Sequence, residues 1–156
     1  MKLETSVFDI WAFRRSAAGV EYLLLHTSQE KADRYFNGGR FWQIPSNLVG
    51  ETESVVQAVS RVLDQFALTP ARIWAAEHVY TIYNRRFDCM QMIAVYAAEV
   101  SANAITLSPA EHSEYRWCSY DEAQSLIHYR GLKDGLRSTQ EYITGPAMPA
   151  RELQLL

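Results

Sequence analysis

The segment 53–67 constrains the fold of this chain more than any other, because it is the clearest amphipathic helix in the sequence. Thr52 or Glu51 is expected to cap its N-terminus, and Pro70 is expected to end it. Its apolar residues form one continuous arc over roughly half of the helix circumference: Val55, Val56, Ala58, Val59, Val62, Leu63, Phe66 and Ala67. An arc this wide is predicted to face the protein core.

Predicted strands lie on both sides of this helix in the sequence. They are rich in β-branched and aromatic residues: 5–14, 20–27, 72–84, 87–100 and 115–119. The first two strands are expected to form a hairpin, and further helices are predicted at 120–129 and 132–143. The polar segment 28–40 is predicted to be a loop, as is 101–111. This order predicts an α+β fold or a mixed-sheet sandwich, because a doubly wound fold would alternate strands and helices.

The chain length fits a single domain. We assign residues 1–146 of the 156 to that domain and 147–156 to a C-terminal tail, expected to be frayed or docked on a neighbour. A net charge of −3 argues against a broad surface for a nucleic-acid polymer or a membrane. A local basic patch could still bind a small phosphorylated molecule.

The two cysteines and the N-terminus indicate the cellular setting. Cys89 and Cys118 lie in apolar segments without zinc-ligand spacing, which predicts buried free thiols. The N-terminal segment contains acidic residues where a signal peptide would need an apolar core. A cytoplasmic protein is therefore expected.

The stretch 41–68, FWQIPSNLVGETESVVQAVSRVLDQFAL, resembles the Nudix box, G-x5-E-x7-R-E-U-x-E-E-x-G-U, in which U is a bulky aliphatic residue. Glu53 falls on the first glutamate of the box and Arg61 on its arginine. The Trp42-x-x-Pro45 lead-in is also similar to that family. Residues 111–117 resemble the closing segment of the branch that hydrolyses dATP-like and dihydroneopterin triphosphate substrates. The resemblance covers residues 4–145 and implies a Nudix-type α/β/α sandwich around a mixed β-sheet.

The box departs from the family pattern at its acidic positions. Val62 replaces the glutamate after the arginine, and Gln65 and Phe66 replace the glutamate pair. Asn47 and Leu68 stand at the two glycine positions. Nudix enzymes use these acids to hold Mg²⁺ or Mn²⁺, which require hard oxygen ligands. Valine and phenylalanine supply no ligand atom, so the resemblance implies that metal-dependent hydrolysis is lost or weak.

Several residues remain candidates for a site. Glu53, Glu111 and Glu114 are the acids that could hold a metal in a rearranged site, and either of the last two could act as the general base. We do not assign a metal site. Binding of a phosphorylated ligand is predicted to involve Arg40, Arg61, Gln65 and Glu114. Arg61 could instead pair with Glu53 at the surface.

Aromatic residues beside the Gly38-Gly39 loop add a further prediction. Tyr35 and Phe36 could stack on a base, whereas Trp42 is expected to pack in the core.

The apolar face around Val62 and Phe66 is expected to be covered by another part of the chain or by another molecule. The candidates are a partner subunit, as in a homodimer, an apolar part of a ligand, or the tail residues Leu153, Leu155 and Leu156.

Three functions therefore remain open on the sequence alone. The first is a Nudix-type protein that binds a nucleotide or related phosphorylated metabolite, with diphosphate hydrolysis lost or weak. The second is an active pyrophosphohydrolase that uses rearranged acidic ligands. The third is a protein-interaction module that uses the apolar box face as its contact.

Overall fold

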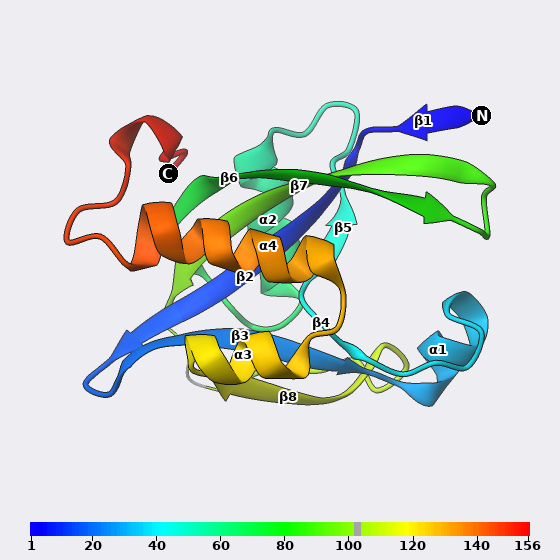
Figure 1. Ribbon diagram of the computed structural model, residues 1–156, viewed down its shortest axis with the longest axis horizontal. Coiled ribbons are helices and arrows are strands. Elements are labelled where there is room, and N and C mark those ends of the chain that lie inside the picture. The colour runs from blue at the N-terminus through cyan, green and yellow to red at the C-terminus, as the bar shows by residue number, and fades with distance from the viewer. Residues whose placement is uncertain (102–103) are drawn as a thin grey trace.

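The computed structural model describes residues 1–101 and 104–156, so residues 102 and 103 of the predicted loop 101–111 lie outside the described residues. In the described residues, one sheet contains eight strands: β1 (Lys2–Glu4), β2 (Val7–Ser16), β3 (Gly19–Thr27), β4 (Trp42–Gln43), β5 (Ser46–Leu48), β6 (Pro70–Asn84), β7 (Cys89–Val100) and β8 (His112–Cys118). The helices are α1 (Gln29–Tyr35), α2 (Val55–Asp64), α3 (Tyr120–Leu126) and α4 (Arg130–Thr139), followed by a π-helical turn (Gln140–Thr144) and a 3-10 turn (Arg151–Leu153). Figure 1 shows this arrangement.

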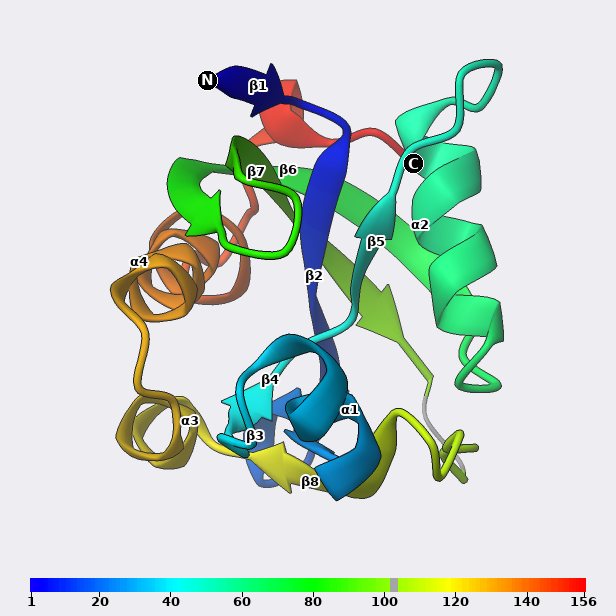
Figure 2. The same cartoon turned by 90° about the vertical axis from the view of Figure 1, so that its right-hand side faces the viewer.

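The sheet is mixed, as predicted. β7 pairs in parallel with β1 and β2 along one edge and antiparallel with β6 along the other. β2 continues antiparallel into β3 and β5, and β3 pairs antiparallel with β4 and β8. Figure 2 shows α3 and α4 on one side of this sheet and α2 on the other. The predicted α/β/α sandwich around a mixed sheet is therefore confirmed.

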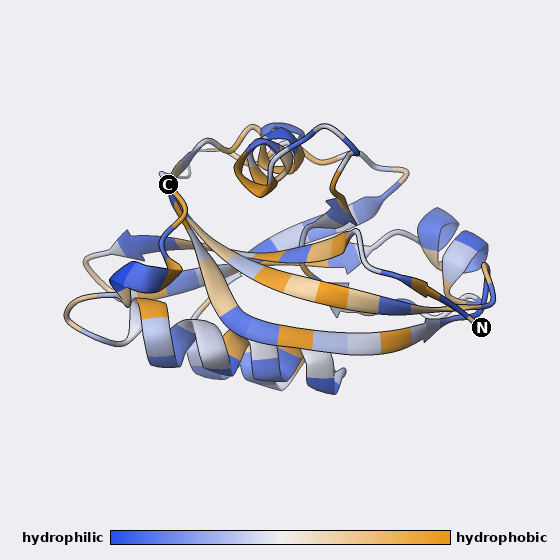
Figure 3. Cartoon of the chain, turned by 90° about the horizontal axis from the view of Figure 1, so that it is seen from above, coloured by the Kyte–Doolittle hydropathy of each residue, from blue (hydrophilic) through white to orange (hydrophobic). Residues whose placement is uncertain are grey.

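Strand β2 separates two hydrophobic cores. Trp11 and Phe13 belong to the core beneath α3 and α4, whereas Ile10 and Ala12 belong to the core beneath α2. Alternating side chains of a strand point to opposite faces, so β2 is buried on both sides. Figure 3 shows the sheet from above with helices on both sides, and the helices are largely hydrophilic on their outer surfaces.

Helix α2 is shorter at both ends than the predicted 53–67. Ser54 caps it in place of the predicted Thr52 or Glu51. The Ser54 Oγ accepts a hydrogen bond from the Gln57 backbone N–H (3.2 Å), and the Ser54 N–H donates to Gln57 Oε1 (2.9 Å). These two reciprocal hydrogen bonds satisfy two backbone N–H groups at once. A threonine cap can do the same only if the residue three positions later offers a side-chain acceptor. The helix ends at Asp64, and Pro70 begins β6.

One expectation for the chain was wrong and another was met in part. The predicted loop 28–40 contains α1, whose Ser28 cap accepts a hydrogen bond from the Lys31 N–H at 3.0 Å. The C-terminal tail was expected to be frayed or docked on a neighbour, and it docks on the neighbouring strand β6. Its Leu155 N–H donates to the Ile73 carbonyl at 2.7 Å, so the tail covers part of the free edge of β6.

The cysteines agree with the prediction. Cys89 and Cys118 are buried free thiols. None of the helices in the described part of the chain is long and apolar enough to cross a membrane.

Gly131 is a position where the absence of a side chain determines the packing of α4. A Cβ built there would lie 2.3 Å from the ring of Tyr80, in β6. Gly131→Ala is therefore expected to lower the free energy of unfolding by about 1–3 kcal/mol, despite the higher helix propensity of alanine. Urea denaturation measures this change. Gly135→Ala, where the nearest atom would be 3.3 Å away, is the control with the smaller expected loss. Equal stability of Gly131→Ala and the unsubstituted chain would contradict this packing.

Candidate functional site

The box face of α2 is closed within the chain. Val62 is 1% exposed and Phe66 is 7% exposed. Both belong to the core beneath α2, and Ile105 and Leu107 pack against the same cluster. The Thr106 N–H donates a hydrogen bond to the Phe66 carbonyl at 3.1 Å, which fixes this loop at the end of the helix. The space beside the missing glutamates is therefore filled by hydrophobic side chains of the same chain.

The sequence predicted three possible coverings for this face, and the structure shows a different one. The face was predicted to be covered by the tail, a partner or a ligand, whereas Val62 and Phe66 lie within the core beneath α2, against which the loop before β8 packs. The tail lies instead against Ile73 and Trp74 of β6. The prediction was made because an apolar surface is stabilised by burial. The chain itself buries this surface, and the loop that carries Ile105 and Leu107 packs against it.

A chain of polar contacts begins next to Phe66. The His112 ring centroid lies 5.9 Å from that of Phe66, and His112 Nε2 lies 2.9 Å from Gln43 Oε1. Lys31 Nζ donates to the same Gln43 oxygen at 2.9 Å and lies 3.3 Å from Glu111 Oε2. Because Oε1 only accepts, His112 Nε2 carries the proton and donates. Burial, assisted by the Lys31 charge, lowers the pKa of His112 to about 4, so the ring is neutral at pH 7.

Glu53, just before α2, forms a two-point ion pair with Arg61, in the last turn of the helix. Arg61 Nε lies 2.7 Å from Glu53 Oε2, and Arg61 Nη2 donates to Glu53 Oε1 at 2.9 Å. Arg61 also donates to the Leu48 carbonyl at 2.7 Å, and the Gly50 N–H donates to Glu53 Oε1 at 3.0 Å. The Arg61 hydrogen bonds, followed by the Gly50 N–H, lower the pKa of Glu53 to about 2. Both charged groups thus join the loop after β5 to the helix.

Arg40 and Glu114 both lie near Nδ1 of His26. Arg40 donates to His26 Nδ1 at 2.9 Å, to Ser113 Oγ at 2.7 Å and to the Thr27 carbonyl at 2.9 Å. Glu114 Oε1 lies 3.8 Å from the same His26 nitrogen. The shorter contact decides the tautomer: Nδ1 accepts from Arg40, so it has no proton to give Glu114. Burial and then the Arg40 charge lower the pKa of His26.

The residues at this site do not fit a catalytic divalent metal. Over residues 1–101 and 104–156, no group of three His, Cys, Asp or Glu side chains is placed to hold a metal ion. Glu53 and Glu111 are each paired with a cation, Glu114 lies beside His26, and Gln65 is exposed. The three candidate acids thus stand in separate contacts, and no hydrolytic step through a metal is derived for this chain.

A buried acid beneath α4, Asp9, was not among the residues predicted from the sequence. Asp9 is 3% exposed and accepts hydrogen bonds from the Tyr80 hydroxyl and from Ser46. Burial raises the pKa of Asp9 to about 6, against the opposing effect of these hydrogen bonds. The signal in the sequence was an acid within the apolar strand segment VFDIWAF.

Comparison with solved structures identifies the fold. A Nudix hydrolase structure from Listeria monocytogenes str. 4b F2365 superposes with a TM-score of 0.73 at 21% identity, covering 93% of this chain and 98% of that one. The Nudix domain of Shewanella oneidensis NrtR, solved with ADP ribose, gives 0.68 at 20% identity, covering 90% and 89%. The E. coli dihydroneopterin triphosphate pyrophosphohydrolase gives 0.64 at 14% identity, covering 93% and 100%. No protein-family model and no curated protein matches the sequence. The chain therefore has the fold of the Nudix hydrolases.

Proposed function

We propose that this protein binds a nucleotide or related phosphorylated small molecule and does not hydrolyse its diphosphate in the Nudix manner. One observation carries the proposal: the helix face that would present the acid cluster is closed by Val62 and Phe66. A diphosphate bound beside this face meets hydrocarbon, which neither gathers cations nor activates water.

The binding half of the proposal is supported by a structural neighbour and by the local charges. The Nudix domain of NrtR was solved with ADP ribose, a ligand with an adenine ring and a diphosphate. Among the described residues, the Lys31 ammonium has two polar contacts, to Gln43 and Glu111, and an ammonium group has three donors. One Lys31 donor thus remains for a phosphate oxygen.

Thermal denaturation and phosphate release together test the proposal. ADP ribose, dATP and dihydroneopterin triphosphate are each added with Mg²⁺ and with EDTA. A ligand present at 100 times its Kd is expected to raise the Tm by roughly 5–10 °C. The increase is expected to be equal with and without Mg²⁺, because no acid cluster holds the metal. Release of phosphate or pyrophosphate is expected to stay at background.

The E. coli dihydroneopterin triphosphate pyrophosphohydrolase serves as the positive control for turnover. Mg²⁺-dependent turnover by this chain that disappears in Glu111→Gln or Glu114→Gln would overturn the non-hydrolytic part. It would establish the pyrophosphohydrolase with rearranged ligands. An unchanged Tm with every compound would overturn the binding part.

The interaction-module alternative loses its proposed contact. That hypothesis needed the Val62 and Phe66 face to be available to a partner, and both side chains are buried in the chain itself. A substitution at Phe66 therefore tests folding and not association.

A further inference from the structure

Part of strand β6 lies at the edge of the sheet without a partner strand. The tail pairs with β6 only around Ile73 and Trp74. In the part of the chain that the structure describes, residues 79–84 pair with β7 on their inner side and with no strand on their outer side. We call this outer side of 79–84 the open edge. Its sequence, VYTIYN, lacks the proline and lysine that protect many exposed strands, so its backbone groups are available to another strand.

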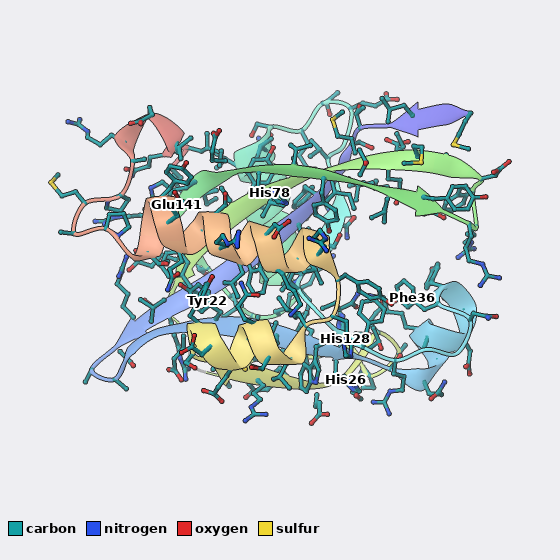
Figure 4. All side chains as sticks on the ribbon, viewed as in Figure 1. Tyr22, His26, Phe36, His78, His128 and Glu141 are labelled. Atoms are coloured by element: carbon teal, nitrogen blue, oxygen red, sulfur yellow. The ribbon has the colours of Figure 1, made fainter. Side chains whose placement is uncertain are left out.

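A bulge separates the open edge from the part of β6 that the tail covers. The pairing with β7 shifts between Ala75 and Val79, and Glu77 within the shift has a φ of 52°. The Ser138 hydroxyl of α4 donates a hydrogen bond to the Glu77 carbonyl at 3.2 Å. His78 lies beside α4, as Figure 4 shows. Helix α4 therefore holds the backbone of the bulge, while the Glu77 side chain remains exposed.

The open edge carries exposed apolar side chains on both faces. Val79 and Tyr83 are 53% and 54% exposed and lie, through the pairing with β7, on the same face of the sheet as Phe8. The Tyr83 hydroxyl donates to Asp88 Oδ1 at 2.8 Å, which orients the ring. Ile82, on the opposite face, is 41% exposed. A further strand beside the open edge would bury all three apolar side chains.

The open edge is complementary to a second copy of itself. When two identical strands pair antiparallel about a two-fold axis, each contact occurs twice, and facing residues lie on the same face of the sheet. With Thr81 on the axis, Tyr83 of one copy faces Val79 of the other. An aromatic side chain opposite a β-branched one is a favourable pair between strands.

The same register brings opposite charges together at both ends of the open edge. Two residues before Val79 is Glu77, and two residues after Tyr83 is Arg85. Both side chains are exposed, and neither forms an ion pair with any residue that the structure describes. In the antiparallel arrangement Glu77 of one copy lies beside Arg85 of the other. A parallel arrangement would instead place like charges together, which is unfavourable.

We propose that the open edge of β6 pairs antiparallel with the open edge of a second copy of this chain, forming a symmetric dimer with one continuous sheet. The dimer is independent of the proposed ligand binding, and it leaves the closed face of α2 outside the interface. One pair of strands buries less than a standard interface, so the expected Kd is roughly 10–100 µM.

Sedimentation equilibrium of the full chain over a concentration range that brackets this Kd tests the dimer. The mass is expected to rise from 17.9 kDa toward twice that value. Glu77→Arg and Arg85→Glu are each expected to weaken association by about tenfold or more, because like charges then face each other. An equimolar mixture of the two variants is expected to associate like the unsubstituted chain, since each facing pair again joins opposite charges. This recovery also shows that both variants are folded.

The control for the charge reversals is Arg137→Glu. The last turn of α4, which contains Arg137, lies toward the opposite end of the molecule from the β6–β7 turn (Figure 1). Arg137→Glu introduces the same change of charge as Arg85→Glu and is expected to leave the association unchanged.

Oxidative cross-linking tests the register. Thr81→Cys places two thiols on the two-fold axis, where facing Cα atoms lie about 4.5–5.5 Å apart, within the range of a disulfide. A covalent dimer is therefore expected on a non-reducing gel. The native Cys89 and Cys118 are buried and do not compete. Tyr83→Cys faces Val79 of the other copy and is expected to stay monomeric on the gel.

Three results would overturn the proposal. The first is a chain that stays monomeric at every concentration, which leaves the open edge without a second copy as its partner. The second is a dimer that tolerates Glu77→Arg and Arg85→Glu as well as it tolerates Arg137→Glu, which places the contact on another surface. The third is equal cross-linking of Thr81→Cys and Tyr83→Cys, which excludes the register.

Discussion

Phe66→Asp is expected to lower the free energy of unfolding by roughly 3–5 kcal/mol, one of the largest effects of any single substitution in this chain. The phenylalanine is 7% exposed between the core beneath α2 and the loop that carries Ile105 and Leu107. Its replacement removes that packing and places an unpaired carboxylate beside the neutral ring of His112. Urea denaturation at pH 7 measures the loss.

The adjacent Gln65 provides the matched control, because it is exposed on the same helix end. Gln65→Asp introduces the same charge and is expected to change the stability by no more than about 0.5 kcal/mol. If Phe66→Asp is as stable as Gln65→Asp, the box face is open to solvent. Mn²⁺ binding by the unsubstituted chain would then support a degenerate but usable metal site.

Much of the fold could be predicted because its signals are local. The apolar arc of 53–67 located α2 and the face that closes the site, and the β-branched and aromatic segments located the long strands. Helix α1 was missed because a short polar helix has no apolar arc and depends on its Ser28 cap and the contacts of Ala32. The strand on which the tail docks could not be predicted, because the edge of β6 is defined only once the sheet has formed.

The candidate site was predicted less well, since it depends on contacts between distant segments. The Glu53–Arg61 pair could be anticipated because both residues belong to the helix region. The Lys31, Gln43 and His112 contacts join α1, β4 and β8, which only the pairing of β4 and β8 with β3 brings together. The importance of Asp9 required knowing that β2 is buried on both faces.

Two buried titratable groups are expected to give opposite pH dependences of stability. The pKa of Asp9 is raised from 3.8 to about 6 in the folded protein. Between these values the folded state binds a proton that the unfolded state has lost, so stability falls as the pH rises through this window. At about 1.4 kcal/mol per pKa unit, the effect amounts to about 3 kcal/mol.

His112 acts in the opposite sense. Its pKa is lowered from 6.5 to about 4, so between these values the unfolded state binds a proton that the folded state does not. Stability therefore falls as the pH drops from 6.5 to 4, again by about 3 kcal/mol. The two windows overlap, and the contributions of Asp9 and His112 are expected to cancel almost completely in the unsubstituted chain.

Single substitutions are expected to reveal each slope separately. Urea denaturation from pH 7.5 to 4 should show that Asp9→Asn loses about 3 kcal/mol more stability toward acid than the unsubstituted chain, because the opposing Asp9 effect is removed. His112→Gln should gain about 3 kcal/mol toward acid relative to the unsubstituted chain, because the opposing His112 effect is removed. The difference between the two variants cancels contributions from the surface carboxylates that all three proteins share. If both variants follow curves parallel to that of the unsubstituted chain, neither group titrates in this window, and Asp9 and His112 are less buried in solution than 3% and 6% exposure implies.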